Sequence, residues 1–228
     1  MLQQHLQWNA ARLAFVCTFL IALIRVRTVN LAEIATGFSG KAKVASHYKR
    51  LQRFFRDFEV DYESIAVTVV KVMQIPEPWV ISIDRTNWQF GKTVFNVLTL
   101  GVVHHGIAFP LGWIMLDKKG NSNTRERCEL WNRFLEIFAD RKIDFLTADR
   151  EFVGEEWFDY LRCEPCTPFR IRIRKNTLLD DGQKQLRAEV CFQDLQIGEF
   201  RLLCKRRQIW GHWLYIAAMR LEDGDVIC

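Results

Sequence analysis

The sequence predicts a mixed α+β protein in which a helical region precedes a body of strands and helices. Two observations support this class. Residues 1–72 contain no proline and have glycine only at positions 37 and 40, which permits continuous helices. From Pro76 onward the chain changes to short runs rich in β-branched and aromatic residues, separated by turn residues and by two helix-like segments. We therefore expect a helical region over 1–75, a mixed-sheet core over 76–176 and a β-rich region over 177–228.

Composition restricts the class of protein. The chain has 228 residues, of which 49% are hydrophobic and 26% charged, enough to bury a sizeable core. Its net charge of +5 permits an anionic partner without demonstrating one. The most apolar stretch, residues 13–24, is shorter than the roughly 20 residues that span a bilayer, so we expect a buried helix and no membrane partner.

Cysteine usage indicates a reducing compartment. The seven cysteines are odd in number and suggest no disulfide framework, so a cytoplasmic location is expected. Cys163 and Cys166 form a single CxxC without a second pair at the spacing of a zinc ribbon. We therefore do not expect a zinc site.

The helical region contains the outline of a helix-turn-helix unit. Asn30 followed by Glu33 has the spacing of a capping box and predicts a helix start. The segment 37–40 then breaks that helix, and another begins near Lys41. Its predicted apolar face consists of Val44, Tyr48, Leu51, Phe55 and Phe58. A helix, a glycine-containing turn and a second helix are typical of DNA-binding units.

Charge on the second of these helices is of one sign. Between positions 41 and 56 there are six basic residues and no acidic one: Lys41, Lys43, Lys49, Arg50, Arg53 and Arg56. An ordinary solvated helix face, the alternative interpretation, usually mixes signs because pairs at i and i+4 stabilise it. The pattern therefore favours phosphate contact, which supplies affinity but no sequence specificity.

Three strands are predicted at the start of the core. The run 79–83 follows two prolines, is rich in Val and Ile, and leads directly into Asp84. Residues 93–101 and 106–116 read as two further strands of an antiparallel meander. Taken alone, Asp84 is either a metal ligand or a residue that hydrogen-bonds a turn.

A second acid follows a second buried strand. A predicted helix over 125–140 precedes the apolar run 143–148, which ends at Asp149. Another helix is expected over 155–163 and a strand over 168–175. That strand would place three arginines on one face, Arg170, Arg172 and Arg174. Like charges in a row repel unless an anion lies near them, so this face also indicates an anionic ligand.

The remaining residues read as further strands, over 187–192, 198–205 and 213–220.

A meander, a helix, a fourth strand, a helix and a fifth strand form the element order of the RNase H-like fold. In that order the first and fourth strands are neighbours, which would bring Asp84 and Asp149 together. Two adjacent carboxylates repel, and a divalent cation such as Mg²⁺ relieves the repulsion while serving phosphoryl transfer.

The residues around both acids resemble one family. Ile83-Asp84-Arg85-Thr86-Asn87-Trp88 and Thr147-Ala148-Asp149-Arg150-Glu151-Phe152 are similar to motifs of the DDE-class transposases of bacterial insertion sequences, in the insertion-sequence-four-like group. The resemblance covers roughly residues 25–228. It implies an RNase H-like mixed sheet, a helical DNA-binding region before it, and a β-rich insertion that begins near 177.

The resemblance also implies site residues, a cofactor and partners. Asp84 and Asp149 would be catalytic residues that hold Mg²⁺ or Mn²⁺, and transposon-end DNA would be the partner. The expected DNA-contacting residues are Lys41, Lys43, Lys49, Arg50, Arg53, Arg85, Arg150, Arg170, Arg172 and Arg174. A homodimer, or pairing with a full-length transposase, is a further expectation.

One family feature is missing from the sequence. The family's third acid is a Glu within a Tyr, Arg, Glu, Lys pattern, in which the Arg stands three residues after the Tyr. Here the residues three beyond the four tyrosines are Leu51, Ile65, Cys163 and Ala218. We therefore expect a truncated product with little or no DNA strand cleavage of its own. The alternatives are a non-catalytic DNA-binding regulator of a full-length transposase, and a different RNase H-like nuclease that cuts structured DNA.

Overall fold

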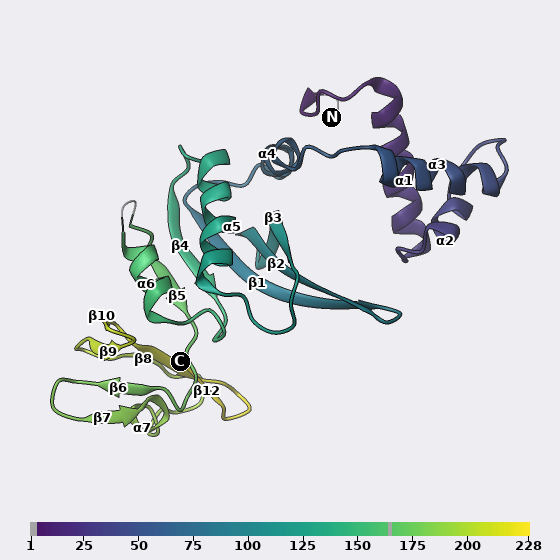
Figure 1. Ribbon diagram of the computed structural model, residues 1–228. Coiled ribbons are helices and arrows are strands. Elements are labelled where there is room, and N and C mark those ends of the chain that lie inside the picture. The colour runs from purple at the N-terminus through teal and green to yellow at the C-terminus, as the bar shows by residue number, and fades with distance from the viewer. Residues whose placement is uncertain (1–3, 164–165) are drawn as a thin grey trace. The chain divides into compact units, whose positions relative to one another are not determined.

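A computed structural model describes residues 4–163 and 166–228 (Figure 1). The described chain is a mixed α+β protein, as the sequence predicts. It divides into two compact units, Met1–Gln74 and Ile75–Cys228, a division that falls beside the boundary expected at 75. No helix among the described residues is long and apolar enough to cross a membrane.

Helices make up the N-terminal unit. They are α1 (Ala10–Val26), α2 (Leu31–Thr36), α3 (Val44–Asp57) and α4 (Tyr62–Met73). Asn30 caps α2 by accepting a hydrogen bond from the backbone N–H of Ala32, so the predicted helix start is confirmed. The first three helices share a core that includes Phe15, Ile34 and Leu51.

Helix α3 differs from the sequence prediction in two ways. It begins at Val44, so the connection from α2 runs over residues 37–43 and is longer than the predicted four-residue turn. Its buried face is also rotated: Val44 and Phe55 are exposed, whereas His47 and Leu51 are buried. The rotation follows from α1, because the ring of Phe15 packs 4.9 Å from that of Phe54.

A five-stranded sheet forms the centre of the C-terminal unit. Its strands are β1 (Trp79–Phe90), β2 (Thr93–His104), β3 (Ile107–Leu116), β4 (Ile143–Ala148) and β5 (Phe169–Ile171), in the order β3-β2-β1-β4-β5. The first three strands are antiparallel, which confirms the predicted meander. β4 pairs in parallel with both β1 and β5. Helices α5 (Thr124–Ile137) and α6 (Glu155–Arg162) precede β4 and β5.

The two faces of this sheet have different surroundings. On one, which we call the core face, Ile81, Ile83 and Leu100 are fully buried, and α5 covers them with Leu130 and Phe134. The approach of α5 is close, since a Cβ added at Gly112 of β3 would lie 3.4 Å from Leu130. Side chains of the opposite face, the open face, alternate with these along each strand.

The C-terminal lobe consists of short strands and one helical turn. Its elements are β6 (Leu178–Asp180), β7 (Gln185–Arg187), α7 (Ala188–Cys191), β8 (Phe200–Leu202), β9 (Arg207–Ile209), β10 (His212–Leu214), β11 (Ala217–Arg220) and β12 (Val226–Ile227). They form the sheets β10-β9-β6-β7 and β12-β11-β8. The strand predicted over 187–192 is wrong, because α7 occupies most of it. Ala188 and Phe192 are four residues apart and both fully buried, a helical spacing that delivers both side chains to the lobe's core.

The lobe is docked against α6 through the turn between β9 and β10. Gly211 has a φ of 77°, and a Cβ there would lie 2.7 Å from the Glu155 carboxylate. Next to it, Nδ1 of His212 lies 3.0 Å from the Arg162 guanidinium, and Nε2 lies 3.4 Å from Asp159. The rings of Phe158 and Trp210 complete the contact at 5.6 Å.

Candidate functional site

The sequence predicted that the first strand ends at Asp84, but in the structure the strand continues past this residue. β1 continues to Phe90, because residues 85–90 remain paired with β2. On its other side, however, β1 loses its neighbour at this point, since the last pair with β4 is Ile83 with Ala148. Asp84 and Asp149 are therefore the next residues on two adjacent parallel strands. The expected juxtaposition of the two acids follows from this register.

Both acids belong to the open face. Ser82 pairs with Thr147 and Thr147 with Arg170, and side-by-side residues point to the same side of a sheet. Two residues further along, Asp84 and Asp149 share that face and are exposed. An oxygen of Asp84 accepts a hydrogen bond from the backbone N–H of Arg85 at 2.7 Å. The Asp149 carboxylate lies 3.4 Å from the Arg172 guanidinium.

Within residues 4–163 and 166–228, no group of three or more His, Cys, Asp or Glu side chains is arranged to hold a metal ion. Two carboxylates on one face are nevertheless a ligand set that Mg²⁺ uses, since it takes one or two carboxylates together with water and substrate phosphate. The donor set therefore fits a weakly held divalent cation that a phosphate completes.

The predicted arginine strand is shorter than expected. β5 ends at Ile171, although the N–H of Arg172 still donates to the carbonyl of Ala148 at 3.0 Å. The alternation itself persists, because Ile173 is buried while Arg170, Arg172 and Arg174 are exposed. The strand stops because the chain turns at Lys175 into the C-terminal lobe. Arg170 stacks 3.9 Å above the ring of Phe145, four residues before Asp149, whereas Arg172 contacts Asp149. Of these two positive charges, Arg172 is therefore the one that lies beside an acid.

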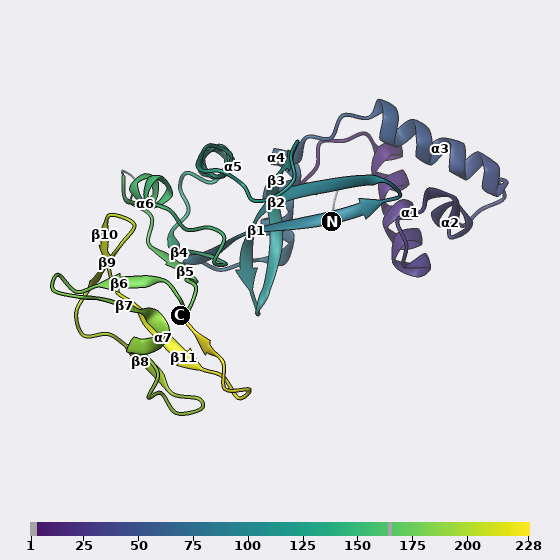
Figure 2. The same ribbon diagram turned by 60° about the horizontal axis from the view of Figure 1, so that its bottom comes forward.

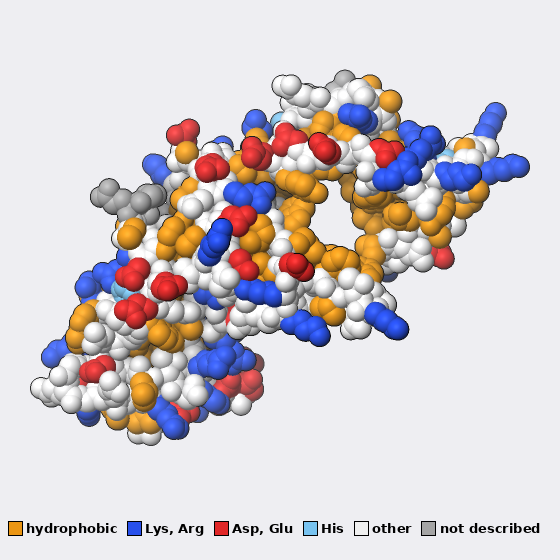
Figure 3. Space-filling view, in the orientation of Figure 1, with side chains coloured by type: hydrophobic (Ala, Val, Ile, Leu, Met, Phe, Trp, Pro, Cys, Tyr) orange, Lys and Arg blue, Asp and Glu red, His pale blue; other side chains and the backbone are white. Residues whose placement is uncertain are grey.

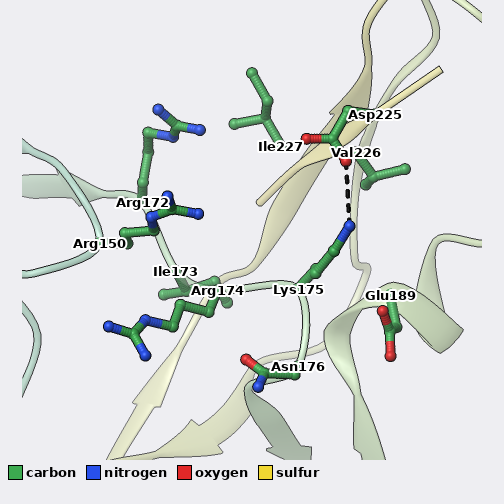
Figure 4. A pocket seen from close by; sticks show the side chains of 10 residues that line it. All are labelled: Arg150, Arg172, Ile173, Arg174, Lys175, Asn176, Glu189, Asp225, Val226 and Ile227. Atoms are coloured by element: carbon green, nitrogen blue, oxygen red, sulfur yellow. Dashed lines mark hydrogen bonds and ion pairs between the residues drawn. The ribbon is translucent and has the colours of Figure 1, made fainter. Parts of the chain in front are cut away.

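A basic pocket of about 300 Å³ opens where β5 leads into the lobe (Figure 4). Arg150, Arg172 and Arg174 lie together on one side of it, and Lys175 pairs with Asp225 at 3.5 Å on the other. Glu189 joins Asp225 on that second side. The pocket therefore has a strongly positive wall close to Asp149, where a phosphate group would find several guanidinium donors.

Arg85 has a different position from the other predicted DNA-contacting residues. It belongs to the core face and forms a two-bond ion pair with Glu151, at 2.9 and 3.0 Å. This pair raises the pKa of the Arg85 guanidinium. Further bonds at 3.3 Å reach Asn96 and Asn121. Arg85 therefore joins β1 to the segment after β4 and positions the two acid-bearing strands.

Arg127 and Asn96 support the same junction, and sequence reasoning did not identify them. Arg127 of α5 is buried and donates to the backbone carbonyls of Glu151 at 3.0 Å and Ser122 at 2.7 Å. Burial lowers its pKa, while the charge of Glu151 opposes the shift. Asn96 donates to the carbonyls of Lys118 and Gly120, both at 2.9 Å. The Asn123–Glu126 capping box is a sequence signal for the start of α5, but no local pattern marks these long-range contacts.

The basic residues of the N-terminal unit are exposed as predicted: Lys41, Lys43, Lys49, Arg50 and Arg53. Figure 3 shows Lys and Arg side chains gathered over this part of the unit. Arg56 differs because it forms an ion pair with Asp57 at 2.6 Å. The guanidinium of Arg50 lies 4.6 Å from the centre of the Phe15 ring, a cation–π contact with the helical core.

The cysteines have no structural pairing. All seven are free thiols. Cys163 and Cys166 are exposed and flank residues 164–165, which lie outside the described part of the chain, so the CxxC segment as a whole is not described.

Comparison with known proteins adds no assignment: no protein-family model and no curated protein matches the chain. Carboxylates such as those of Asp84 and Asp149 are suitable ligands for a hard cation, and Arg150 and Arg172 line the neighbouring pocket, where guanidinium donors suit a phosphate. A second basic surface lies on α3.

Proposed function

We propose that this chain is a DNA-binding protein of the transposase type, built on the core that joins and cuts DNA ends in DDE enzymes. One observation carries the proposal: the pairing of Ile83 with Ala148 makes Asp84 and Asp149 the next residues on adjacent strands, on one face, with Arg172 beside them. Such a group of opposite charges suits a phosphodiester and a divalent cation better than a small neutral substrate.

The fold supports the same proposal. An order of β3-β2-β1-β4-β5, with three antiparallel strands followed by two parallel ones, is the arrangement expected of an RNase H-like core. A separate β-rich lobe follows β5, where the insertion of the transposase group would begin. The motifs around Asp84 and Asp149 resemble those of the same group, so topology and local sequence agree.

Residues of this chain would act mainly by binding and orientation. Asp84 and Asp149 would hold Mg²⁺ or Mn²⁺, which when bound supplies charge neutralisation at the reacting phosphate. Arg172, Arg150 and Arg174 would orient the DNA backbone from the pocket side. Arg85, fixed by Glu151, would keep the two acid-bearing strands in register. With two carboxylates and no third ligand among the described residues, we expect little strand cleavage by this chain alone.

Nicking of DNA tests the catalytic part of the proposal. Supercoiled plasmid would be incubated with the chain and Mg²⁺ or Mn²⁺, and the conversion to the relaxed form measured. We expect at most a trace above an Asp84→Asn control. Robust cleavage that Asp84→Asn abolishes would show that two carboxylates suffice and would overturn the expectation of weak activity.

DNA binding tests the other part. Fluorescence anisotropy with duplex DNA would be measured over a salt series for the wild type, for Lys49→Glu with Arg53→Glu, and for a control with the same charge change, Lys119→Glu with Lys205→Glu. All four positions are exposed. We expect the α3 variant to lose affinity and to reduce the slope of log K against log salt by about 2, because two phosphate contacts are lost. Equal effects of the two variants would remove α3 from the DNA interface.

A non-catalytic regulator of transposition is the second candidate function. It is favoured by the ion pair between Arg172 and Asp149, which satisfies one of the two carboxylates without a metal. A regulator would bind DNA equally well with Mg²⁺ or with a chelator present and would not cut it. Metal-dependent tightening of DNA binding that Asp149→Asn abolishes would argue for the transposase-type site instead.

A further inference from the structure

We propose that the distal part of the β1–β2 hairpin is an arm that stacks on unpaired DNA bases beside the two acids. We call residues Thr86–Phe95 the aromatic arm. This inference rests on the proposed function, since it takes DNA as the partner, and it adds a contact to bases that neither the acids nor the basic surfaces provide.

The arm is a two-stranded ribbon that extends beyond the rest of the sheet (Figures 1 and 2). On the β1 side, pairing with β4 ends at Ile83. On the β2 side, pairing with β3 ends at Asn96, opposite Leu116. Every residue from Thr86 to Phe95 is consequently exposed. Both faces of the ribbon are therefore accessible, unlike the covered strands of the central sheet.

Three aromatic rings occupy one face of the arm. Trp88 is 58% exposed, Phe90 50% and Phe95 37%. Trp88 and Phe95 are direct cross-strand partners, and the rings of Phe90 and Phe95 meet edge to face at 5.7 Å. Because side chains alternate along a strand, Trp88 and Phe90 point to the same side as Asp84. The aromatic rings and the acids thus share the open face.

Exposed aromatic rings on an isolated hairpin indicate a role in binding. Two strands alone are marginally stable in water, and the cross-strand contacts of Phe95 with Trp88 and Phe90 help to stabilise the ribbon. All three rings nevertheless remain exposed and available for binding. Base stacking on aromatic side chains is a common solution, because every base presents a flat ring and the contact tolerates any sequence.

Charge favours a nucleic acid as the occupant. From Arg85 to Leu116 the chain contains no Asp or Glu, so the arm itself carries no charge that repels phosphates. Lys92 stands at the tip, and Arg170 and Arg172 lie further along the same sheet face.

The geometry predicts which base is contacted. Trp88 stands four residues beyond Asp84, a separation of about 13 Å along an extended strand. Since a stacked nucleic acid strand rises about 3.4 Å per nucleotide, the ring of Trp88 would meet a base about four nucleotides from a phosphate bound at the acids.

The test compares DNA with and without unpaired bases. Two duplexes of equal length, one fully paired and one with a single-stranded end, would be titrated with the wild type, with Trp88→Ala and with Phe90→Ala. Trp213→Ala, in β10 of the C-terminal lobe, removes an exposed tryptophan away from the arm and is the matched control. We expect Trp88→Ala to weaken binding to the single-stranded end about tenfold, while binding to the paired duplex changes less than twofold. Trp213→Ala should leave both unchanged.

Other outcomes would overturn the inference. An equal loss on both DNAs would mean that the arm does not distinguish unpaired bases. If instead the wild type self-associates, and Trp88→Ala abolishes this without changing DNA binding, the arm is a contact between copies of the chain. If the wild type binds both DNAs and Trp88→Ala has no effect, the base-stacking role of the arm is refuted while the proposed DNA-binding function stands. If the wild type binds neither DNA, both the role of the arm and the proposed function are refuted.

Discussion

The two faces of the five-stranded sheet differ in what their residues do. On the core face, apolar side chains and the Arg85–Glu151 pair are enclosed by α5 and by the segment after β4. On the open face, Asp84, Asp149 and Trp88 are exposed, although they belong to the same strands or follow them directly. Neighbouring residues of one strand can therefore have opposite roles. Stability is concentrated on one face and binding capacity on the other.

The largest contrast is expected between two tryptophans of β1. Trp79 is 1% exposed and packs 5.3 Å from Phe138, whereas Trp88 is exposed. Trp79→Ala should destabilise the C-terminal unit by about 4 kcal/mol, because the large cavity cannot collapse. Trp88→Ala should change stability by no more than about 1 kcal/mol. Urea unfolding followed by tryptophan fluorescence reports this unit, since every tryptophan except Trp8 lies in it. Similar losses for the two variants would abolish the distinction between the faces.

A smaller contrast is expected between the adjacent residues Arg85 and Asp84. Arg85→Met should cost about 3 kcal/mol, because it leaves the mostly buried Glu151 carboxylate without its partner. A double variant with Glu151→Gln should recover part of this loss. Asp84→Asn should stay within about 0.5 kcal/mol of the wild type. The same urea titrations measure all three, and a cost for Asp84→Asn that matches Arg85→Met would place Asp84 among the structural residues.

The smallest expected effect is a pH-dependent change in stability at Glu77. This residue lies just before β1, at the end of the strand opposite to Asp84. Glu77 bonds to Arg141 at 2.7 Å and to the backbone N–H of Lys142 at 2.9 Å, and these contacts lower its pKa, the Arg141 bond most. A lowered pKa gives stability that is present above the unfolded value of about 4.3 and is lost as pH falls through the folded value.

Glu77→Gln should accordingly reduce stability near neutral pH, and the difference from the wild type should disappear in strong acid. Thermal unfolding of both proteins over a pH series measures this. A difference that stays constant down to strong acid would show that the Glu77 contact does not depend on its charge.

Sequence patterns predicted the elements that pack against a core. The runs ending at Asp84 and Asp149 are strongly apolar, so the two strands and their meander were recognisable. The continuation of β1 to Phe90 was not, because four polar residues, Asp84 to Asn87, interrupt the apolar run before Trp88 and Phe90. An exposed ribbon has no core that requires an unbroken apolar pattern.

Long-range partners were also outside the reach of sequence reasoning. Nothing local to Arg85 indicates a bond to Glu151, and its position beside Asp84 suggested a DNA contact instead. In the lobe, the β-branched and aromatic residues of 187–192 suggested a strand, whereas burial of Ala188 and Phe192 at helical spacing determined α7. The transposase-type function, the metal and the DNA partner remain predictions that the experiments above test.

The contact between the C-terminal lobe and α6 has a mechanical consequence. Gly211 is pressed against Glu155, and His212 lies between Asp159 and Arg162, so the β9–β10 turn is held by side chains from successive turns of one helix. With these contacts formed, the lobe is joined to α6 as well as to the segment that leaves β5. Force applied to the lobe, for example by a bound duplex, would be transmitted through α6 to the central sheet rather than absorbed by a flexible linker.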